Sequence, residues 1–353
     1  MLCRKPFLKG HGSARAAYPC GGCPPCRANL RRLWTSRIQI ESYSHAKSCF
    51  VTLTYNDDHL PYVILDNYVE DGVEKSQYSL ISRGNNYGTN SHSSLYPRDA
   101  QLYMKRLRSL HHARCVSQKV AHTPIRFYLV GEYGDKSWRP HYHLALFGLG
   151  EEDLDLISDA WKMDGKSMGF VYVGDLSKHS AAYIAGYVTK KLTTASDYKQ
   201  EGYEGKTNAE KLDGRHPEFS RSSNRPGIGA NSLPLIVDAL KNPAWFKEVL
   251  ESGDVPYVLR VGSTELPLGR YLRTRLRKIL GLKKINPDGE VSYGAPLQAI
   301  QEAANELHTL FETWLADTSL QQVSFQKYLS SLDDGKALQQ VTRDRNKVQR
   351  RTI

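Results

Sequence analysis

The stretch Arg139-Pro140-His141-Tyr142-His143-Leu144-Ala145-Leu146-Phe147-Gly148 decides the fold, because it predicts one β-strand that carries two histidines. Side chains alternate between two faces along a strand, so His141 and His143 point to one face while Tyr142 and the leucines point to the other. Two imidazoles on one sheet face are half of a metal site. The alternative is a pair of ordinary surface or core histidines, and the surrounding sequence decides between the two.

The residues before this stretch predict its partner strand. Residues 125–133 are rich in β-branched and aromatic side chains, and the short polar segment 134–138 follows. Two strands with so short a connection pair as an antiparallel hairpin, which places Glu132 close to His141. Two imidazoles and a carboxylate suit a divalent cation with open positions for a substrate oxygen. The alternative for Glu132 is an ion pair with Arg139.

The remaining pattern indicates an α+β fold, with a central antiparallel sheet flanked by helices. Periodicity and end signals predict two further strands and several helices. The strands are 47–55 and 169–176, and the helices are 27–43, 97–112, 151–163 and 180–192. Residues 66–96 are polar without a sustained period, which predicts a long surface loop or an insertion.

The helix expected at 180–192 carries a second chemical signal. At about 100° per residue, Tyr183, Tyr187 and Lys190 share one side of the helix, and Ala181, Ile184, Ala185, Val188 and Leu192 form an apolar face on the other. A phenolate beside a metal is a good nucleophile toward phosphorus. The alternative is a helix with two half-buried tyrosines.

The N-terminus predicts a second metal site. Cys20, Cys23 and Cys26 lie within seven residues of a glycine- and proline-rich segment, and Cys3 is the natural fourth ligand. Such spacing is typical of structural zinc. Unliganded thiols and a redox role are the alternatives; an iron–sulfur cluster needs a further cysteine where Leu30 stands.

Net charge and hydropathy limit the classes of function that the chain can have. Lys and Arg outnumber Asp and Glu by 48 to 37, a net charge of +11 that favours a polyanionic partner such as nucleic acid, although a basic protein without such a partner has the same composition. No run reaches the roughly 18 to 20 apolar residues of a membrane span. A basic start without a following apolar region predicts no signal peptide, hence a cytoplasmic protein with reduced cysteines. Without a nucleotide-binding motif, an ATP-driven motor is not expected.

The second half of the chain is less informative. Residues 196–233 are polar and glycine-rich and predict a linker or loop, and residues 234–353 predict a mostly helical region. Within it, 270–284 is a basic helix that suits either DNA or solvent. We therefore expect four parts: a Cys-rich segment with a basic helix at 1–45, a core at 46–195, the linker, and the helical region.

Taken together, three motifs resemble a known family. They are Phe50-Val51-Thr52-Leu53-Thr54-Tyr55, then Glu132-Tyr133-Gly134 with Arg139-Pro140-His141-Tyr142-His143, then Tyr183-x-x-x-Tyr187-x-x-Lys190. This order resembles the HUH endonucleases that initiate rolling-circle replication, in their two-tyrosine branch. The cysteine motif and Gly131-Glu132-Tyr133-Gly134 resemble the initiators of microvirus-type (gokushovirus) single-stranded DNA phages.

The resemblance implies roles for these residues within a core similar to RNA-recognition folds. His141, His143 and Glu132 would hold Mg²⁺ or Mn²⁺, and Tyr183 and Tyr187 would cut single-stranded DNA at a viral origin in turn. Each cut leaves a 5′-phosphotyrosine and a free 3′-hydroxyl for a host polymerase, beside a host helicase, in the bacterial cytoplasm. Lys190 would assist the phenols, and we also expect DNA contacts from Arg139, Lys191, Arg106 and Arg108.

Two other readings remain open at the level of sequence. One is a non-catalytic, zinc-containing protein that binds single-stranded nucleic acid, which explains the charge and the cysteines but not the joint occurrence of the histidine and tyrosine pairs. The other is a related HUH relaxase or transposase, which shares the chemistry and differs in its substrate.

Overall fold

The structure is a computed structural model that describes residues 3–9, 16–84, 91–134, 137–190, 212–240 and 254–279, with short stretches between 309 and 332. The chain divides into two units, one of residues 1–32 with 277–353 and one of residues 33–276. The sheet lies in the second unit. In the first, β1 (Phe7–Lys9) pairs with β2 (Ala16–Tyr18) before α1 (Pro24–Ser42) begins.

A five-stranded antiparallel sheet forms the centre of the second unit, in the order β11-β3-β8-β7-β12. This confirms the expected α+β class with a central antiparallel sheet. The strands are β3 (Ser48–Thr54), β7 (Arg126–Tyr133), β8 (Pro140–Phe147), β11 (Val171–Asp175) and β12 (Phe219–Ser222). The predicted hairpin is β7–β8, and the alternating burial along β3 shows why these residues form a strand with two distinct faces.

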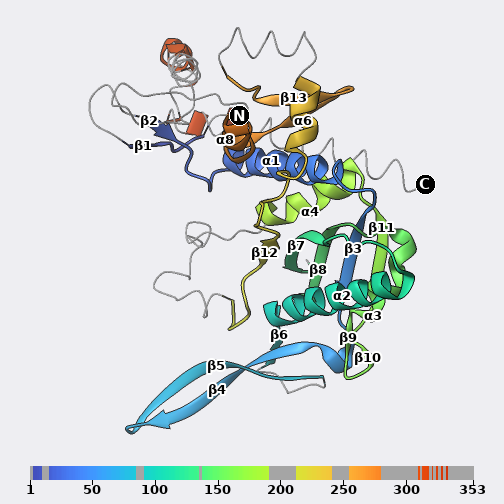
Figure 1. Cartoon of the computed structure of the whole chain (residues 1–353). Helices are drawn as coiled ribbons and strands as arrows, with labels where there is room; N and C mark the ends of the chain where they lie inside the picture. The colour runs from blue at the N-terminus through green and yellow to red at the C-terminus, as the bar shows by residue number, and fades with distance from the viewer. Residues whose placement is uncertain are drawn as a thin grey trace, which may run out of the picture. The chain divides into compact units, whose positions relative to one another are not determined.

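One face of the sheet packs on α2 (Pro97–Gln118) and α3 (Leu154–Asp159) (Figure 1). The side chains of this core come from alternate strand positions and from the inner line of α2. Its largest fully buried members are Trp161, Tyr103, Tyr142, Leu53, Leu95, Leu107, Leu129 and Leu144. The second residue of the histidine motif, Tyr142, is therefore a core residue, as strand alternation predicts.

The opposite face packs on the part of α1 after Leu33 and on α4 (Lys178–Lys190) (Figure 1). Here Trp34 and Ile38 from α1 and Ala181 and Ile184 from α4 cover Tyr128, Val130, Ala145 and Phe147. Since this is also the face of His141 and His143, the covering helices border the candidate site.

Two of our expectations are wrong for the same local reason. Residues 66–96 were expected to form a long surface loop or an insertion, and the loop is wrong for their described part. They belong largely to a hairpin of β4 (Pro61–Glu70) and β5 (Val73–Arg83), with β6 (Ser91–Ser93) on the other side of β4, and the hairpin extends as an arm in Figure 1. The helix predicted at 151–163 ends at Asp159 after a 3₁₀ turn at Glu151–Asp153, and β9 (Lys162–Met163) and β10 (Lys166–Ser167) follow. Both hairpins turn on an Asp-Gly pair with positive φ.

The predicted linker also holds structure. Within its described part, β12 adds the fifth strand beside β7, so the expectation of a linker is wrong for these residues. Further along, α6 (Leu233–Leu240) precedes a hairpin of β13 (Val258–Val261) and β14 (Thr264–Pro267), and α8 (Gly269–Ile279) carries the basic sequence. The other residues of 234–353 lie mostly outside the described part.

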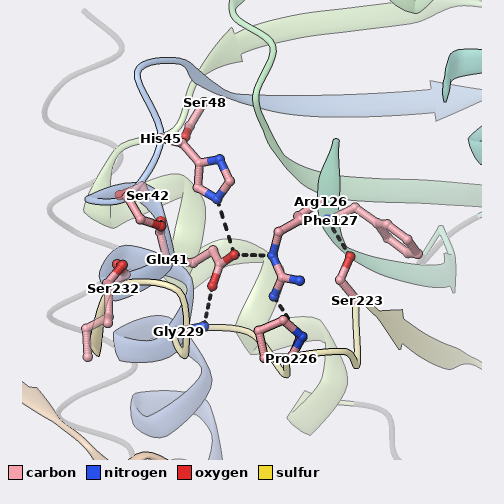
Figure 2. A network of polar contacts seen from close by, with 12 residues as sticks. Glu41, Ser42, His45, Ser48, Arg126, Phe127, Ser223, Pro226, Gly229 and Ser232 are labelled. Atoms are coloured by element: carbon pink, nitrogen blue, oxygen red, sulfur yellow. Dashed lines mark hydrogen bonds and ion pairs between the residues drawn. The ribbon is translucent and has the colours of Figure 1, made fainter. Parts of the chain in front are cut away.

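A buried ionic network joins α1, β7 and the loop after β12 (Figure 2). The Glu41 carboxylate is fully buried and accepts hydrogen bonds from Arg126 Nε and from the Gly229 N–H at 2.5 Å, and it pairs with His45 at 3.2 Å. Arg126 also donates to the Pro226 carbonyl at 2.8 Å. Burial alone would raise the pKa of Glu41, but the bonds from His45, Arg126 and Gly229 lower it below its ordinary value.

We predict that Glu41→Gln lowers the free energy of unfolding at pH 7 by about 3–5 kcal/mol, because it leaves the Arg126 guanidinium buried without its counter-ion. The depressed pKa of Glu41 means that this stability is present above the unfolded pKa near 4.5 and is lost as pH falls through the folded value. Urea denaturation between pH 7 and pH 3 measures both effects.

The exposed pair Lys47–Glu152 supplies the control, since Glu152→Gln removes the same charge at the surface. No measurable change in unfolding is expected for that variant. Equal losses in the two variants would contradict a structural role for the buried network.

Candidate functional site

The two histidines of β8 lie side by side on one face of the sheet. Antiparallel register pairs His141 with Thr54 and His143 with Thr52 on β3. The two imidazole rings are parallel within 2°, and their centroids are 6.5 Å apart. The predicted alternation therefore brings both rings to the same side, with Tyr142 between them turned into the α2 core.

Glu132 completes this group from the neighbouring strand. It pairs in register with His141, as the hairpin predicts, and its Oε1 lies 3.0 Å from His143 Nε2. The alternative, an ion pair of Glu132 with Arg139, is not formed, since Arg139 pairs with Asp57 at 2.7 Å. Both Glu132 and His143 are buried, at 6% and 5% exposure, so their contact is sheltered from water.

Thr52 is a site residue that the sequence analysis did not single out. Its Oγ1 lies 2.9 Å from His143 Nδ1. A ring nitrogen held in this way fixes the orientation of the imidazole and leaves the other nitrogen for a ligand. The signal was present in the sequence, because Thr52 alternates with buried residues on the strand that borders β8, but it required the strand order.

Two buried polar atoms of this group have no hydrogen-bond partner among the described residues. They are Glu132 Oε2 and His141 Nδ1. Burial of an unsatisfied donor or acceptor is costly, and such atoms call for an explanation such as a bound ion or water. Burial, and secondly the charge of His143, lowers the pKa of His141, which favours the neutral imidazole that metals bind.

Two imidazoles and a carboxylate are a donor set that suits a divalent cation with open positions. Metal–ligand distances of about 2.1 Å in an octahedron place neighbouring ligand atoms about 3.0 Å apart. The Glu132 Oε1 to His143 Nε2 distance is 3.0 Å, and the unsatisfied Glu132 Oε2 is a further donor. His141, His143 and Glu132 could therefore hold such an ion, although only the last two already lie at ligand spacing.

Helix α4 brings a tyrosine to this group. The Tyr183 ring meets the His143 ring edge-on at a centroid distance of 5.3 Å, and it also meets Phe50 at 6.0 Å. Tyr183 is 46% exposed, whereas Ala181, Ile184 and Ala185 of the predicted apolar face are buried. The expected meeting of the tyrosine helix with the histidine strand is thus present for Tyr183. The side chains of Tyr187 and Lys190, and the whole of Lys191, lie outside the described residues.

The arginines predicted to contact DNA have protein partners elsewhere. Arg106 donates to the Ala160 carbonyl at 2.8 Å, and Arg108 lies over the Phe127 ring. Both belong to α2, on the opposite face of the sheet from the histidines. Arg139 lies near the hairpin turn and donates to the Tyr55 carbonyl at 2.7 Å. Arg106 and Arg108 therefore do not lie at the candidate site with the histidines, and their contact with DNA stays a prediction.

This arrangement has counterparts in known proteins. Residues 48–192, which run from β3 to just beyond α4, match the family model described as replication-associated protein ORF2. The matched segment holds the histidine strand and the tyrosine helix, and the resemblance to phage replication-associated proteins is confirmed.

Individual relatives agree. The chain is 32% identical over 194 residues to replication-associated protein ORF2 of Spiroplasma virus 4, covering 52% of this chain and 51% of that protein. It is 29% identical over 199 residues to replication-associated protein VP4 of Bdellovibrio phage phiMH2K, covering 52% and 51%. Identity to replication-associated protein ORF4 of Chlamydia phage 1 is 26% over 201 residues, covering 51% and 39%.

The matches have limits in length and kind. The chain spans about half the length of the first two curated relatives that it matches. No solved structure matches the chain. Within the described residues, no helix combines the length and the apolar character that crossing a membrane requires.

We predict that the His141 imidazole titrates below its ordinary pKa of 6.5 in the folded protein. Because the unfolded chain then binds this proton first, the contribution of His141 to stability falls as pH drops below about 6.5. Imidazole NMR signals followed with pH, and assigned by their loss in His141→Gln, measure the pKa. An unshifted His141 would contradict its burial, and the loss of stability between pH 7 and pH 5 should be smaller in His141→Gln.

Proposed function

We propose that this protein is a rolling-circle replication initiator that nicks and rejoins single-stranded DNA by tyrosine attack, as an HUH-type endonuclease and strand transferase. The observation that carries the proposal is the contact of Tyr183 with His143 beside Glu132. If His141 and His143 were ordinary core residues, a half-exposed tyrosine in contact with His143 would have no evident purpose. The similarity of residues 48–192 to phage replication-associated proteins supports replication over a relaxase or transposase role.

The residues that would hold Mg²⁺ or Mn²⁺ are His141, His143 and Glu132. When bound, such an ion supplies charge that polarises a phosphate oxygen of the DNA. The chain's own groups do the rest. Thr52 holds the His143 ring in orientation, and the buried Glu132 carboxylate supplies negative charge that retains a cation in this position.

The covalent step uses the phenol oxygen as nucleophile. The Tyr183 or Tyr187 oxygen forms a bond to phosphorus, the bond from phosphorus to the 3′-oxygen breaks, and the departing oxygen takes up a proton as the phenol loses one. The products are a 5′-phosphotyrosine and a free 3′-hydroxyl. Since one phosphodiester replaces another, the reverse step by a new 3′-hydroxyl rejoins DNA. Tyr183 is exposed enough to pass its proton to water.

Two tyrosines one helical turn apart suit two successive cuts. In this proposal one phenol begins a round of replication and the other ends it, and Lys190, on the same side of α4 by helical periodicity, stabilises the charge on the phosphorus. The DNA partner agrees with the net charge of +11. The free 3′-hydroxyl would serve a host polymerase, with a host helicase separating the strands, in the host cytoplasm.

We predict that Thr52→Val weakens Mn²⁺ binding by about 10- to 100-fold without unfolding the protein, because the His143 ring loses its second hydrogen bond. Electron paramagnetic resonance of free Mn²⁺ measures the affinity, and circular dichroism checks the fold. His141→Ala and Glu132→Ala should weaken binding further. Thr54→Val is the matched control, since Thr54 faces the same side but donates to the Phe170 carbonyl. Equal losses from the two threonine variants would count against the assigned role of Thr52.

We predict an SDS-stable complex with single-stranded DNA and Mn²⁺ that keeps a 3′ label and releases a 5′ label, because the link is a 5′-phosphotyrosine. A pool of random-sequence oligonucleotides avoids assuming the origin. Single Tyr183→Phe and Tyr187→Phe variants should each keep part of the complex, and the double variant should lose it. Mass spectrometry of the linked peptide identifies the tyrosine.

Tyr172→Phe provides the control for this experiment, since Tyr172 is an exposed tyrosine on the neighbouring strand β11 that also meets Phe50. It should form the complex at the level of the unchanged protein. DNA binding without any covalent complex, in the unchanged chain and in all variants, would leave a non-catalytic nucleic-acid-binding protein.

A further inference from the structure

The four N-terminal cysteines form a cluster that the nicking chemistry does not use. The ligand atoms of Cys3, Cys20, Cys23 and Cys26 all lie within 4.8 Å of one another. In the described part of the chain, no other group of three or more histidine, cysteine and acidic side chains converges in this way. All four cysteines are free thiols rather than halves of disulfides.

Two sulfur–sulfur distances in the cluster are close to those of a tetrahedral zinc site. Cys23 Sγ lies 3.9 Å from Cys3 Sγ, and Cys20 Sγ lies 4.0 Å from Cys26 Sγ. Four sulfurs at about 2.3 Å from one zinc ion stand about 3.8 Å apart along each edge of a tetrahedron. A disulfide needs about 2.05 Å, so the sulfurs are arranged around a common centre and not in bonded pairs.

Two backbone N–H groups of the cluster donate hydrogen bonds to its sulfur atoms. The Cys23 N–H donates to Cys20 Sγ at 3.4 Å, and the Cys20 N–H donates to Cys3 Sγ at 3.1 Å. Gly21 makes the turn between Cys20 and Cys23 with a φ of +77° that favours glycine. Cys26 lies in the first turn of α1.

The position of the ligands in the chain shows what the site would join. Cys3 precedes β1, Cys20 follows β2, and Cys23 and Cys26 border the start of α1. The β1–β2 hairpin has three residues in each strand, and its Phe7 and Tyr18 rings stack at 5.5 Å while remaining exposed. A two-stranded hairpin of this size is marginal in water on its own, so it needs a further constraint.

We propose that Cys3, Cys20, Cys23 and Cys26 bind one structural Zn²⁺ that fastens the β1–β2 hairpin to the beginning of α1. Four thiolates in tetrahedral arrangement are a closed site, with no open position for a substrate. The energy of binding is therefore folding energy for this part of the chain. The site is independent of the proposed nicking reaction, whose ligands are histidines and a carboxylate.

Metal analysis of the full-length protein, purified without chelators, tests the proposal. We expect one zinc per chain, lost in Cys3→Ser and in Cys23→Ser. Two matched variants should keep it: Cys115→Ser, which alters a cysteine outside the cluster, and the double variant His141→Ala, His143→Ala, which removes the candidate nicking ligands. Zinc that survives in the cluster variants, or that leaves with the histidines, would overturn the proposal.

A second measurement separates metal binding from misfolding of the serine variants. Thiol titration of the unchanged protein with a mercurial reagent should release zinc as four thiols react, while the buried Cys49 and Cys115 react later. Replacement by Co²⁺ should give the intense sulfur-to-cobalt absorption of a tetrahedral thiolate site, shifted in Cys26→His.

The hairpin supplies the structural readout. Removal of zinc should expose the chain before α1 to limited proteolysis and leave the sheet resistant, and return of zinc should restore protection. A protein that takes up no zinc after anaerobic reduction and reconstitution, or one that carries iron with visible absorption in place of zinc, would overturn the assignment.

Discussion

The antiparallel register of β3, β8 and β7 is the constraint on which the site depends. It sets Thr52 opposite His143 and Glu132 opposite His141, so that three strands deliver their polar side chains to one small area. Because side chains alternate with a period of two, a slip of one residue would turn both imidazoles into the core and bring Tyr142 to the site. The positions of the candidate site residues therefore depend on this strand pairing.

The opposite face of the sheet secures that pairing. Tyr142 is fully buried there, and its hydroxyl lies 3.0 Å from the Tyr55 hydroxyl and accepts from the Tyr96 N–H at 3.0 Å. Tyr55 in turn donates to the Asp99 carboxylate at 2.6 Å, and both terminal nitrogens of Arg83 donate hydrogen bonds to the same carboxylate. A buried phenol with satisfied hydrogen bonds has one acceptable position, so the residue between the histidines fixes the direction of both imidazoles.

The candidate site residues also differ in their exposure to solvent. Glu132 and His143 are nearly inaccessible, whereas Tyr183 beside them is 46% exposed. A sheltered donor set strengthens electrostatic interaction with a cation, since water screens it less. The exposed phenol of Tyr183 would stay accessible to a ligand as large as the proposed DNA substrate. The helix that carries Tyr183 achieves this by burying Ala181 and Ile184 against the sheet, small and medium side chains that let it approach closely.

Much of this arrangement follows from sequence because it rests on local periodicity. The alternation around His141 and His143, the β7–β8 hairpin and the two sides of α4 are properties of short segments. The role of Thr52 does not follow from its motif alone, because it depends on which strand lies beside β8. The β4–β5 and β9–β10 hairpins were missed although Asp71-Gly72 and Asp164-Gly165 mark them. The sequence of residues 66–96 has no sustained apolar period, so the turn residues were the stronger signal.

The similarity to replication-associated proteins covers residues 48–192, and the fold shows why this segment is not a complete structural unit. The face of β7 and β8 that carries Tyr128, Ala145 and Phe147 is covered by Trp34 and Ile38 before the segment and by Ile228 after it. Glu41 and Gly229 also lie outside it and meet at Arg126 within it (Figure 2). The matched segment holds the candidate site residues, but burial of its second face and neutralisation of Arg126 depend on residues outside it. Since an exposed apolar sheet face and an unpaired buried charge are both costly, the matched segment needs these flanking residues for its own stability, and the geometry of the candidate site depends on them.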